Sequence, residues 1–153
     1  MIIRPTRDDD RLPLAHLYAA VAEERVHIGG EPPVDLEKRA ASWTLDGAFA
    51  AVVDGELVGQ LAVINSGHGF GEIGMMVARE WRGRGVGTAL MQVAIAYARE
   101  QGLHKLTLSV FAHNEPAIAL YRKCGFVEEG RRVKHYRRSN GELFDSVEMG
   151  LLL

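Results

Sequence analysis

Three glycines at alternate positions, Gly83, Gly85 and Gly87, follow a short apolar run and lead into an apolar pattern of helical period. Glycine adopts positive φ easily and has no Cβ to hold a ligand away from the backbone. A glycine-rich loop at the start of a helix directs several unpaired N–H groups the same way, and the helix dipole favours an anion there. We therefore interpret the stretch from Glu72 to Leu90 as a strand, a pyrophosphate-binding loop and a helix start.

Two common nucleotide-binding patterns do not fit these glycines. A Walker loop requires Lys-Ser or Lys-Thr after them, and the chain has neither there. A dinucleotide fingerprint requires a glycine where Thr88 stands, and an acidic residue about 20 positions further on, where the chain reads Val110-Phe111-Ala112. The pattern that remains is Arg82-x-x-Gly85-x-Gly87, and a glycine-rich turn that binds nothing is the open alternative.

A second motif follows downstream and reads Asn114-x-x-Ala117-x-x-x-Tyr121-x-x-x-Gly125-Phe126. Asn114 is a typical helix cap, and Gly125 is typical of a helix end with Phe126 packing back. Tyr121 lies on this amphipathic helix, where its hydroxyl is either a proton donor or simply part of a packed aromatic side chain. The motif therefore predicts a short, well-defined helix that carries one chemically useful hydroxyl.

In this order the two motifs resemble the acetyl-CoA-binding motifs of the GNAT superfamily of N-acetyltransferases, and the resemblance covers essentially the whole chain. It implies an α/β fold with a mixed, mostly antiparallel sheet, splayed central strands and helices on both faces. It also implies a single domain, residues 1–153, that transfers acetyl directly from acetyl-CoA to a primary amine in a ternary complex. The pattern around Asn140-Gly141 is similar to members that act on small amines, amino acids and protein N-termini, and such domains commonly form homodimers.

The resemblance also implies which residues bind the cosubstrate. Backbone groups of three strand residues would pair with the pantetheine like an added strand: Met75, Met76 and Val77. The pyrophosphate would be held by the loop and the helix start, with the two arginines adding charge: Arg82, Gly83, Arg84, Gly85, Val86, Gly87 and Thr88. The second motif would supply Asn114, Ala117 and Tyr121, with Tyr121 as the general acid that protonates the leaving thiolate.

Acetyl transfer to an amine also requires a proton acceptor, because an alkyl amine with a pKa of about 10.4 is mostly protonated at neutral pH. Glu72, at the start of the central strand, is the candidate base, either directly or through a water. The alternative is that Glu72 only begins a strand in solvent. A backbone N–H near Met76 or Val77 is the candidate oxyanion donor.

Composition sets wider bounds. The 153 residues carry a net charge of −2, so no overall basic field predicts binding to nucleic acid or to a membrane. No apolar run approaches the length of a membrane span, and the N-terminus does not resemble a signal peptide. A single cysteine, Cys124, cannot form an internal disulfide and is expected to pack as a small apolar residue. We expect a cytoplasmic protein, and the six histidines show no metal-ligand spacing.

Two rival functions remain open. The run from Arg131 to Arg138 is a basic cluster with one aromatic residue, which would suit a nucleic-acid-binding module, although a solvated hairpin at the substrate mouth is the preferred interpretation. The other rival is an acyl-CoA-binding regulator that kept the cofactor site and lost turnover. The presence of Tyr121 and Glu72 favours an enzyme.

Turn, cap and periodicity signals place the elements. Asp54-Gly55 predicts a hairpin turn, and Asp8-Asp9-Asp10 is the candidate cap of the first helix. The main helix is expected to carry an apolar stripe of Val86, Leu90, Val93 and Tyr97. Strands are expected at Met1–Thr6, Phe49–Val53, Leu57–Ile64, Glu72–Val77, Lys105–Phe111, Val127–Arg132 and Phe144–Leu152. Helices are expected to end near Glu24, to follow a cap at Asp35, to run from Val86 to Gly102, and to run from Asn114 to Gly125. Residues 26–34 are expected to form a loop, either a lid or a simple connection.

Overall fold

The computed structural model describes residues 1–153 and contains one seven-stranded sheet in the order β1-β2-β3-β4-β5-β7-β6. The strands are β1 (Ile2–Pro5), β2 (Ala48–Val53), β3 (Glu56–Asn65), β4 (Phe70–Val77), β5 (Lys105–Phe111), β6 (Val127–Arg137) and β7 (Leu143–Leu152). Only β4 and β5 are parallel neighbours, and every other pair is antiparallel. The predicted mixed, mostly antiparallel fold is therefore confirmed.

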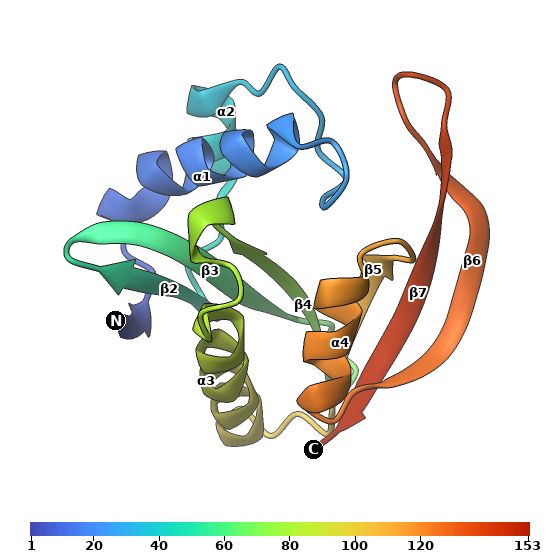
Figure 1. Ribbon diagram of the computed structural model, residues 1–153. Coiled ribbons are helices and arrows are strands. Elements are labelled where there is room, and N and C mark those ends of the chain that lie inside the picture. Colours follow the sequence, from blue (N-terminus) through green and yellow to red (C-terminus); the bar gives the residue numbers. More distant parts are fainter.

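Helices cover both faces of this sheet, as predicted (Figure 1). The helices are α1 (Arg11–Glu23), α2 (Leu36–Ser42), α3 (Val86–Glu100) and α4 (Glu115–Lys123), with short 3-10 turns η1 (Asp8–Asp10) and η2 (Arg79–Trp81). One face carries α1 and α2, and the other carries α3 and α4. No helix is both long enough and apolar enough to cross a membrane.

The central strands β4 and β5 separate after a very short pairing. Phe70–Glu72 pairs with Lys105–Thr107, and no register continues beyond these residues. On their outer sides both strands stay paired, β4 with β3 up to Val77 and β5 with β7 up to Phe111. Two strand edges therefore face each other across a widening gap, which confirms the predicted splayed strands (Figure 1).

Helix α3 is held against the sheet by one buried stripe. Its fully or nearly fully buried residues are Val86, Leu90, Met91, Ala94 and Ala98. The predicted stripe identified the first two of these correctly. Val93 and Tyr97, the other two residues of the predicted stripe, are only half-buried. The buried face of the helix continues instead through Ala94 and Ala98. This packing fixes the N-terminus of α3 beside the end of β4.

Most of the turn and cap signals in the sequence predicted the helices and strands correctly. Asp54 and Gly55 both have positive φ, 47° and 79°, and form the tight turn between β2 and β3. The Asp35 side chain caps α2 by accepting from the Lys38 N–H at 3.1 Å. Strand β6 is longer than expected and reaches Arg137, because Asp145 accepts the Lys134 N–H at 2.7 Å and supports a bulge instead of a strand end.

The three aspartates near the N-terminus act differently from the predicted helix cap. They form the 3-10 turn η1, and no side-chain cap bond starts α1. The Asp10 carboxylate instead accepts two hydrogen bonds from the Arg4 guanidinium, at 2.7 and 3.0 Å, and one from the Arg7 N–H at 2.7 Å. Arg4 keeps the pKa of Asp10 below its ordinary value, and the pair ties β1 to the start of α1.

Candidate functional site

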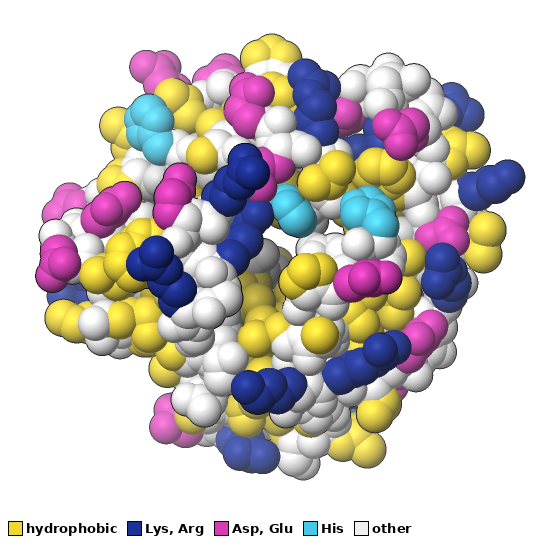
Figure 2. Space-filling view, viewed as in Figure 1, with side chains coloured by type: hydrophobic (Ala, Val, Ile, Leu, Met, Phe, Trp, Pro, Cys, Tyr) yellow, Lys and Arg dark blue, Asp and Glu magenta, His cyan; other side chains and the backbone are white.

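A cavity of about 780 Å³ occupies the gap between β4 and β5. One wall is β4 from Ile73 to Val77, and the opposite wall is the end of β5 together with α4. Residues 27–29, between α1 and α2, line its upper part, and most of the other lining residues are apolar. Figure 2 shows the corresponding hollow near the centre of this face, with histidine side chains along its upper edge.

The glycine loop brings unpaired N–H groups to this cavity. None of the six consecutive N–H groups from Gly83 to Thr88 donates a hydrogen bond within the protein, and α3 has no side-chain cap. Gly83 and Gly85 have φ of 72° and 84°, and a Cβ added to either would meet no atom within 4 Å. The loop is therefore a row of free donors beside open space, at the positive end of a 15-residue helix.

The edge of β4 provides a second set of backbone groups. Met75, Met76 and Val77 pair with β3 on one side, and on the other side they face the cavity with no strand partner. The side chains of Met75 and Val77 pack toward α3, whereas Met76 packs against α1. An extended ligand in the gap can therefore pair with this edge as an extra strand would.

The second motif forms the opposite wall as predicted. Asn114 caps α4 by accepting from the Ala117 N–H at 3.4 Å, and Asn114, Ala117 and Tyr121 all line the cavity. Only 7% of Tyr121 is exposed, and its hydroxyl makes no hydrogen bond within the protein. Burial, together with the nearby Cys124 sulfur, raises the pKa of Tyr121 to about 12. The hydroxyl is therefore protonated at neutral pH and free to donate.

The side chains of the two loop arginines do not both face the cavity. Arg82 lines it, but its guanidinium donates to both carboxylate oxygens of Glu24 at 2.7 Å and to the Val77 carbonyl at 3.1 Å. Arg84 is exposed, lies over the Trp81 ring at 4.9 Å and does not line the cavity. The free donors beside the open space are thus backbone N–H groups, and a contact from either arginine side chain to a phosphate stays a prediction.

Glu72 lies next to the cavity but does not line it. Its side chain is exposed and shares one face of β4 with Gly74 and Met76, which both line the cavity. A Cβ on Gly74 would meet no atom within 4 Å, so the space between Glu72 and the cavity is open along this face. Proton transfer through water is compatible with this geometry, and the role of Glu72 as the base stays a prediction.

Cys124 behaves as expected from the sequence. It is partly buried, packs against the main core, and its burial raises the pKa of the thiol. A protonated thiol is a poor nucleophile. No group of three or more His, Cys, Asp or Glu side chains is placed to hold a metal ion.

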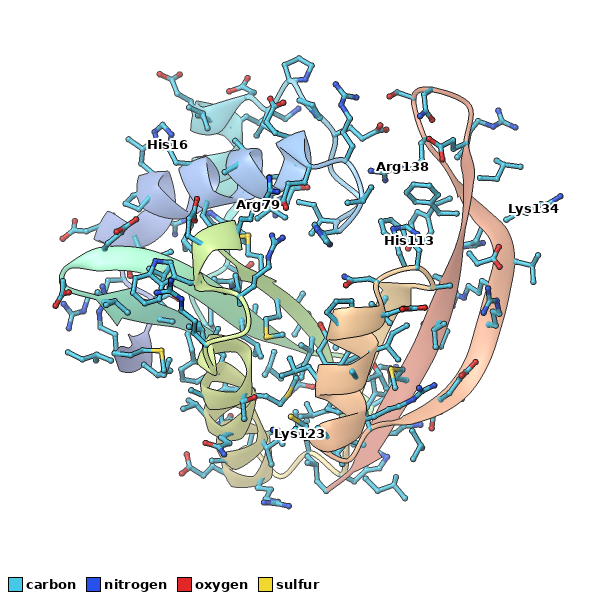
Figure 3. All side chains as sticks on the ribbon, viewed as in Figure 1. His16, Arg79, His113, Lys123, Lys134 and Arg138 are labelled. Carbon is cyan, nitrogen blue, oxygen red and sulfur yellow. The ribbon has the colours of Figure 1, made fainter.

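Residue Arg138, which belongs to the basic cluster in the sequence, has a structural role that sequence reasoning missed. It is 5% exposed, and its guanidinium donates to the backbone carbonyls of Arg25, Ile28 and Gly29 at 3.1–3.3 Å. His113 lies nearby, and its Nε2 donates to the Val26 carbonyl at 2.6 Å (Figure 3). We call residues 25–31 the acceptor-side loop; these bonds hold it against the β6–β7 hairpin.

The rest of the basic cluster is an exposed hairpin with acidic partners. Arg131 pairs with Asp145 at 2.7 Å, and Arg132 pairs with Glu148 at 3.4 Å. Residues 131–137 are exposed, as the solvated-hairpin interpretation predicted. No local sequence signal distinguishes Arg138 from these neighbours, because its carbonyl partners lie more than 100 residues away in the chain.

Comparison with known proteins identifies the family. Residues 14–126 match the sequence model of the Acetyltransferase (GNAT) family, which is well over half of the chain. The chain belongs to the GNAT acetyltransferase family. The match includes the glycine loop, β5 and the whole of α4, so it covers both motifs.

A curated relative is the L-amino acid N-acetyltransferase AaaT of Escherichia coli K12, with 35% identity over 107 residues, covering 66% of this chain and 65% of the relative. Two mycothiol acetyltransferases and the spermidine N(1)-acetyltransferase of Vibrio cholerae are matched over 36%, 48% and 54% of their own length, so the chain spans between about a third and two thirds of these four relatives.

Among solved structures, the ribosomal-protein-alanine N-acetyltransferase from Brucella melitensis is 29% identical, with a TM-score of 0.89 and 100% coverage of both chains. A GNAT superfamily phosphinothricin acetyltransferase from Sinorhizobium meliloti, solved in complex with AcCoA, is 18% identical. It has a TM-score of 0.88 and covers 99% of this chain and 88% of its own, which shows a shared fold.

The Glu24–Arg82 pair makes a prediction about stability. We expect Glu24→Gln to lower the free energy of unfolding by about 1–3 kcal/mol at neutral pH, because a bidentate, charge-assisted contact is replaced by weaker ones. Arg82 keeps the pKa of Glu24 below its usual 4.5, so this stabilisation is complete above pH 4.5 and is lost as the pH falls through the lower folded-state pKa.

Urea denaturation at neutral pH and at steps below pH 4.5 measures this effect. The difference between the wild type and Glu24→Gln should narrow as the pH falls. Glu37→Gln, on the exposed side of α2, is the matched control and should leave stability unchanged. A difference that stays constant with pH would contradict the ion pair.

Proposed function

We propose that this chain is an N-acetyltransferase that transfers acetyl from acetyl-CoA to a primary amine by direct transfer in a ternary complex. The observation that carries the proposal is the row of six unpaired N–H groups opening into the same cavity as a free strand edge and a free tyrosine hydroxyl. Backbone donors at a helix start suit a diphosphate, a free strand edge suits the amide-bearing pantetheine, and the buried hydroxyl suits the sulfur.

The residues of the chain fit this cosubstrate. The N–H groups from Gly83 to Thr88 would hold the diphosphate, and the absence of any atom within 4 Å of a Cβ built on Gly85 leaves room for it. Met75, Met76 and Val77 would pair with the pantetheine, and Asn114, Ala117 and Tyr121 would contact it from α4. Acetyl-CoA supplies the acetyl group as a thioester, which is activated toward an amine.

Tyr121 acts on the leaving sulfur. As the amine nitrogen bonds to the carbonyl carbon and the carbon–sulfur bond breaks, negative charge develops on sulfur, and the Tyr121 hydroxyl donates a hydrogen bond to it. An ordinary thiol has a pKa of about 8.5, so full proton transfer from a hydroxyl with a pKa of about 12 is uphill. The main contribution of Tyr121 is therefore stabilisation of the developing charge.

The amine must lose its proton on the other side of the reaction. No Asp or Glu side chain lines the cavity, and Glu72 is adjacent to it across the open space at Gly74. We propose that Glu72 accepts the proton through water, and that a backbone N–H near Met76 or Val77 stabilises the carbonyl oxygen. The product of this transfer is an amide, and its nitrogen does not take up a proton near neutral pH.

The test of this function is thiol release from acetyl-CoA with a panel of amines, combined with direct measurement of acetyl-CoA binding. Thiol release that depends on both the protein and an amine supports the transferase. Tight binding with no amine-dependent release, across amino acids, polyamines and peptides, would favour an acyl-CoA-binding regulator instead.

We expect Gly85→Val to abolish acetyl-CoA binding, because its side chain would enter the space beside the loop and would distort a backbone held at φ 84°. Gly55→Val is the matched control, because Gly55 has φ 79° and equally open surroundings but lies in the β2–β3 turn. Calorimetric titration should show binding lost only in Gly85→Val, while both variants lose similar stability. Equal affinity in the two variants would contradict the loop assignment.

We expect Tyr121→Phe to lower kcat by on the order of a hundredfold, the usual loss when one preorganised donor is removed from a developing charge. Acetyl-CoA affinity should change little. Tyr97→Phe, which alters a tyrosine packed on Phe49 away from the cavity, is the control. Steady-state kinetics measures both variants, and an unchanged kcat in Tyr121→Phe would refute the donor role.

We expect Glu72→Gln to shift the pH–rate profile toward higher pH, because the amine must then lose its proton to bulk solvent before it reacts. Glu100→Gln, at the exposed end of α3, is the control. The measurement is kcat/KM against pH with one amine. A profile that does not move would show that another group, or water alone, takes the proton.

A further inference from the structure

We propose that the acceptor is an amine with a carbonyl or carboxylate group next to it and an apolar side chain, as in an α-amino acid or a peptide N-terminus, and that polyamines are excluded. This inference rests on the proposed acetyltransferase function and concerns the acceptor end of the same cavity. It follows from which hydrogen-bonding groups at that end are free and which are already used by the protein.

No carboxylate lines the acceptor end of the cavity. No Asp or Glu lines the cavity, and the charged side chains that do are Arg82 and Lys123. The nearest carboxylate of the α1 end, Glu24, has both oxygens occupied by Arg82. Glu31 in the acceptor-side loop accepts from both the N–H and the hydroxyl of Ser139. Glu72 lies beside the cavity, but the proposed function assigns it to the reacting amine, so a second ammonium group would enter without a counter-charge of its own, which is costly.

Four backbone carbonyls of the acceptor-side loop are also occupied. The Arg138 guanidinium donates to the carbonyls of Arg25, Ile28 and Gly29, and the His113 ring donates to the carbonyl of Val26. The Arg138 guanidinium also lies 5.3 Å from the centre of the Phe111 ring, so the protein's own cation already uses the face of that ring. Along this wall a polyamine therefore finds these four carbonyls and this face of Phe111 already in use.

His27 supplies a free donor instead. Its Nε2 lies 3.2 Å from a nitrogen of the Arg82 guanidinium, which can only donate, and 3.5 Å from Glu24 Oε1, which already accepts from Arg82 at 2.7 Å. The shorter contact favours an accepting Nε2 and therefore the tautomer with its proton on Nδ1. The groups facing this ring are Glu24, Arg82 and His113, and burial and Arg82 lower the pKa of His27, so the ring stays neutral. The Nδ1–H has no partner within the protein, and His27 lines the cavity.

The remaining wall is apolar. Ile28, Phe111 and Tyr136 line this end, and Phe111 and Tyr136 pack edge to face with ring centres 5.2 Å apart. A free N–H donor beside aromatic and aliphatic surface suits a carbonyl oxygen next to an apolar side chain. Free amino acids and peptide N-termini share this chemistry.

Four acceptors test the proposal by thiol release from acetyl-CoA. L-Leucine and L-leucinamide carry the carbonyl, 3-methylbutylamine has the same side chain without it, and spermidine is the polyamine. Each kcat/KM is calculated from the concentration of the unprotonated amine, because the four amines differ in pKa. We expect kcat/KM for leucine or leucinamide to exceed that for 3-methylbutylamine and for spermidine by about tenfold or more, the value of one hydrogen bond of about 1.4 kcal/mol.

A leucyl tetrapeptide in the same assay distinguishes the two sources, because no carboxylate then stands next to the amine and the chain continues beyond the first carbonyl. Preference for either leucine or the peptide supports the shared chemistry. Spermidine or 3-methylbutylamine used as well as leucine would overturn the inference and leave the acetyltransferase function intact. No thiol release with any amine would contradict the proposed function and this inference together.

Two pairs of variants test which residues determine the acceptor preference. His27→Leu should reduce the preference for leucinamide over 3-methylbutylamine by raising KM for leucinamide alone, whereas His27→Asn, which keeps an N–H donor, should retain part of it. Ile28→Glu should raise kcat/KM for spermidine by supplying the missing carboxylate, and Ile28→Gln should not. Acetyl-CoA binding measured in each variant confirms an intact fold. An unchanged acceptor preference in both His27→Leu and Ile28→Glu would refute the proposal.

Discussion

The structure depends on the early separation of β4 and β5. Three residues of each strand pair, and beyond them two strand edges face each other with unpaired backbone groups. Unpaired backbone groups inside a protein are costly, and sheets normally avoid exposing them in their interior. Here the outer strands β3 and β7 and the helices α3 and α4 keep both edges fixed, so the gap is held open by the surrounding fold. A ligand that can extend one of these edges recovers hydrogen bonds that the sheet leaves unmade.

Two arginines hold the walls of this gap together at the acceptor end. Arg82 connects the end of β4 to the end of α1 through Val77 and Glu24, and Arg138 connects the β6–β7 hairpin to the acceptor-side loop. Both guanidiniums donate to several protein acceptors, as partly or fully buried charges require, although the Nε of Arg138 is buried without a partner. The planar, five-donor guanidinium suits this role because it reaches several acceptors at once. The same bonds occupy the Glu24 carboxylate and three carbonyls of the acceptor-side loop, so the contacts that fix the shape of the cavity also set the polarity of this end.

The sequence predicted features whose signals are local and missed those whose partners are distant. The Asn114 cap, the Asp54-Gly55 turn and the alternating glycines each act within a few residues, and all lie where expected. Glu24 and Arg82 are 58 residues apart, and Arg138 is 109 residues from Gly29, so neither contact leaves a pattern along the chain. The carbonyl partners of Arg138 are backbone groups, which every residue has, and they therefore carry no sequence signal at all.

The backbone and the arginine side chains of the loop have different partners, which explains why the loop contains glycines beside arginines. If the arginine side chains had to neutralise a diphosphate, Arg82 would be needed in the cavity, yet its donors go to Glu24 and Val77. In the proposed function the anion would be held by main-chain N–H groups, which require that nothing stand beside the backbone, and glycine at positive φ meets this requirement. Arg82 instead ties the glycine loop to Glu24 and Val77, and its contact with His27 favours the tautomer protonated on Nδ1. One side chain thus contacts both the element that would bind the cofactor and the wall that would face the acceptor, so changes that move Arg82 are expected to alter both.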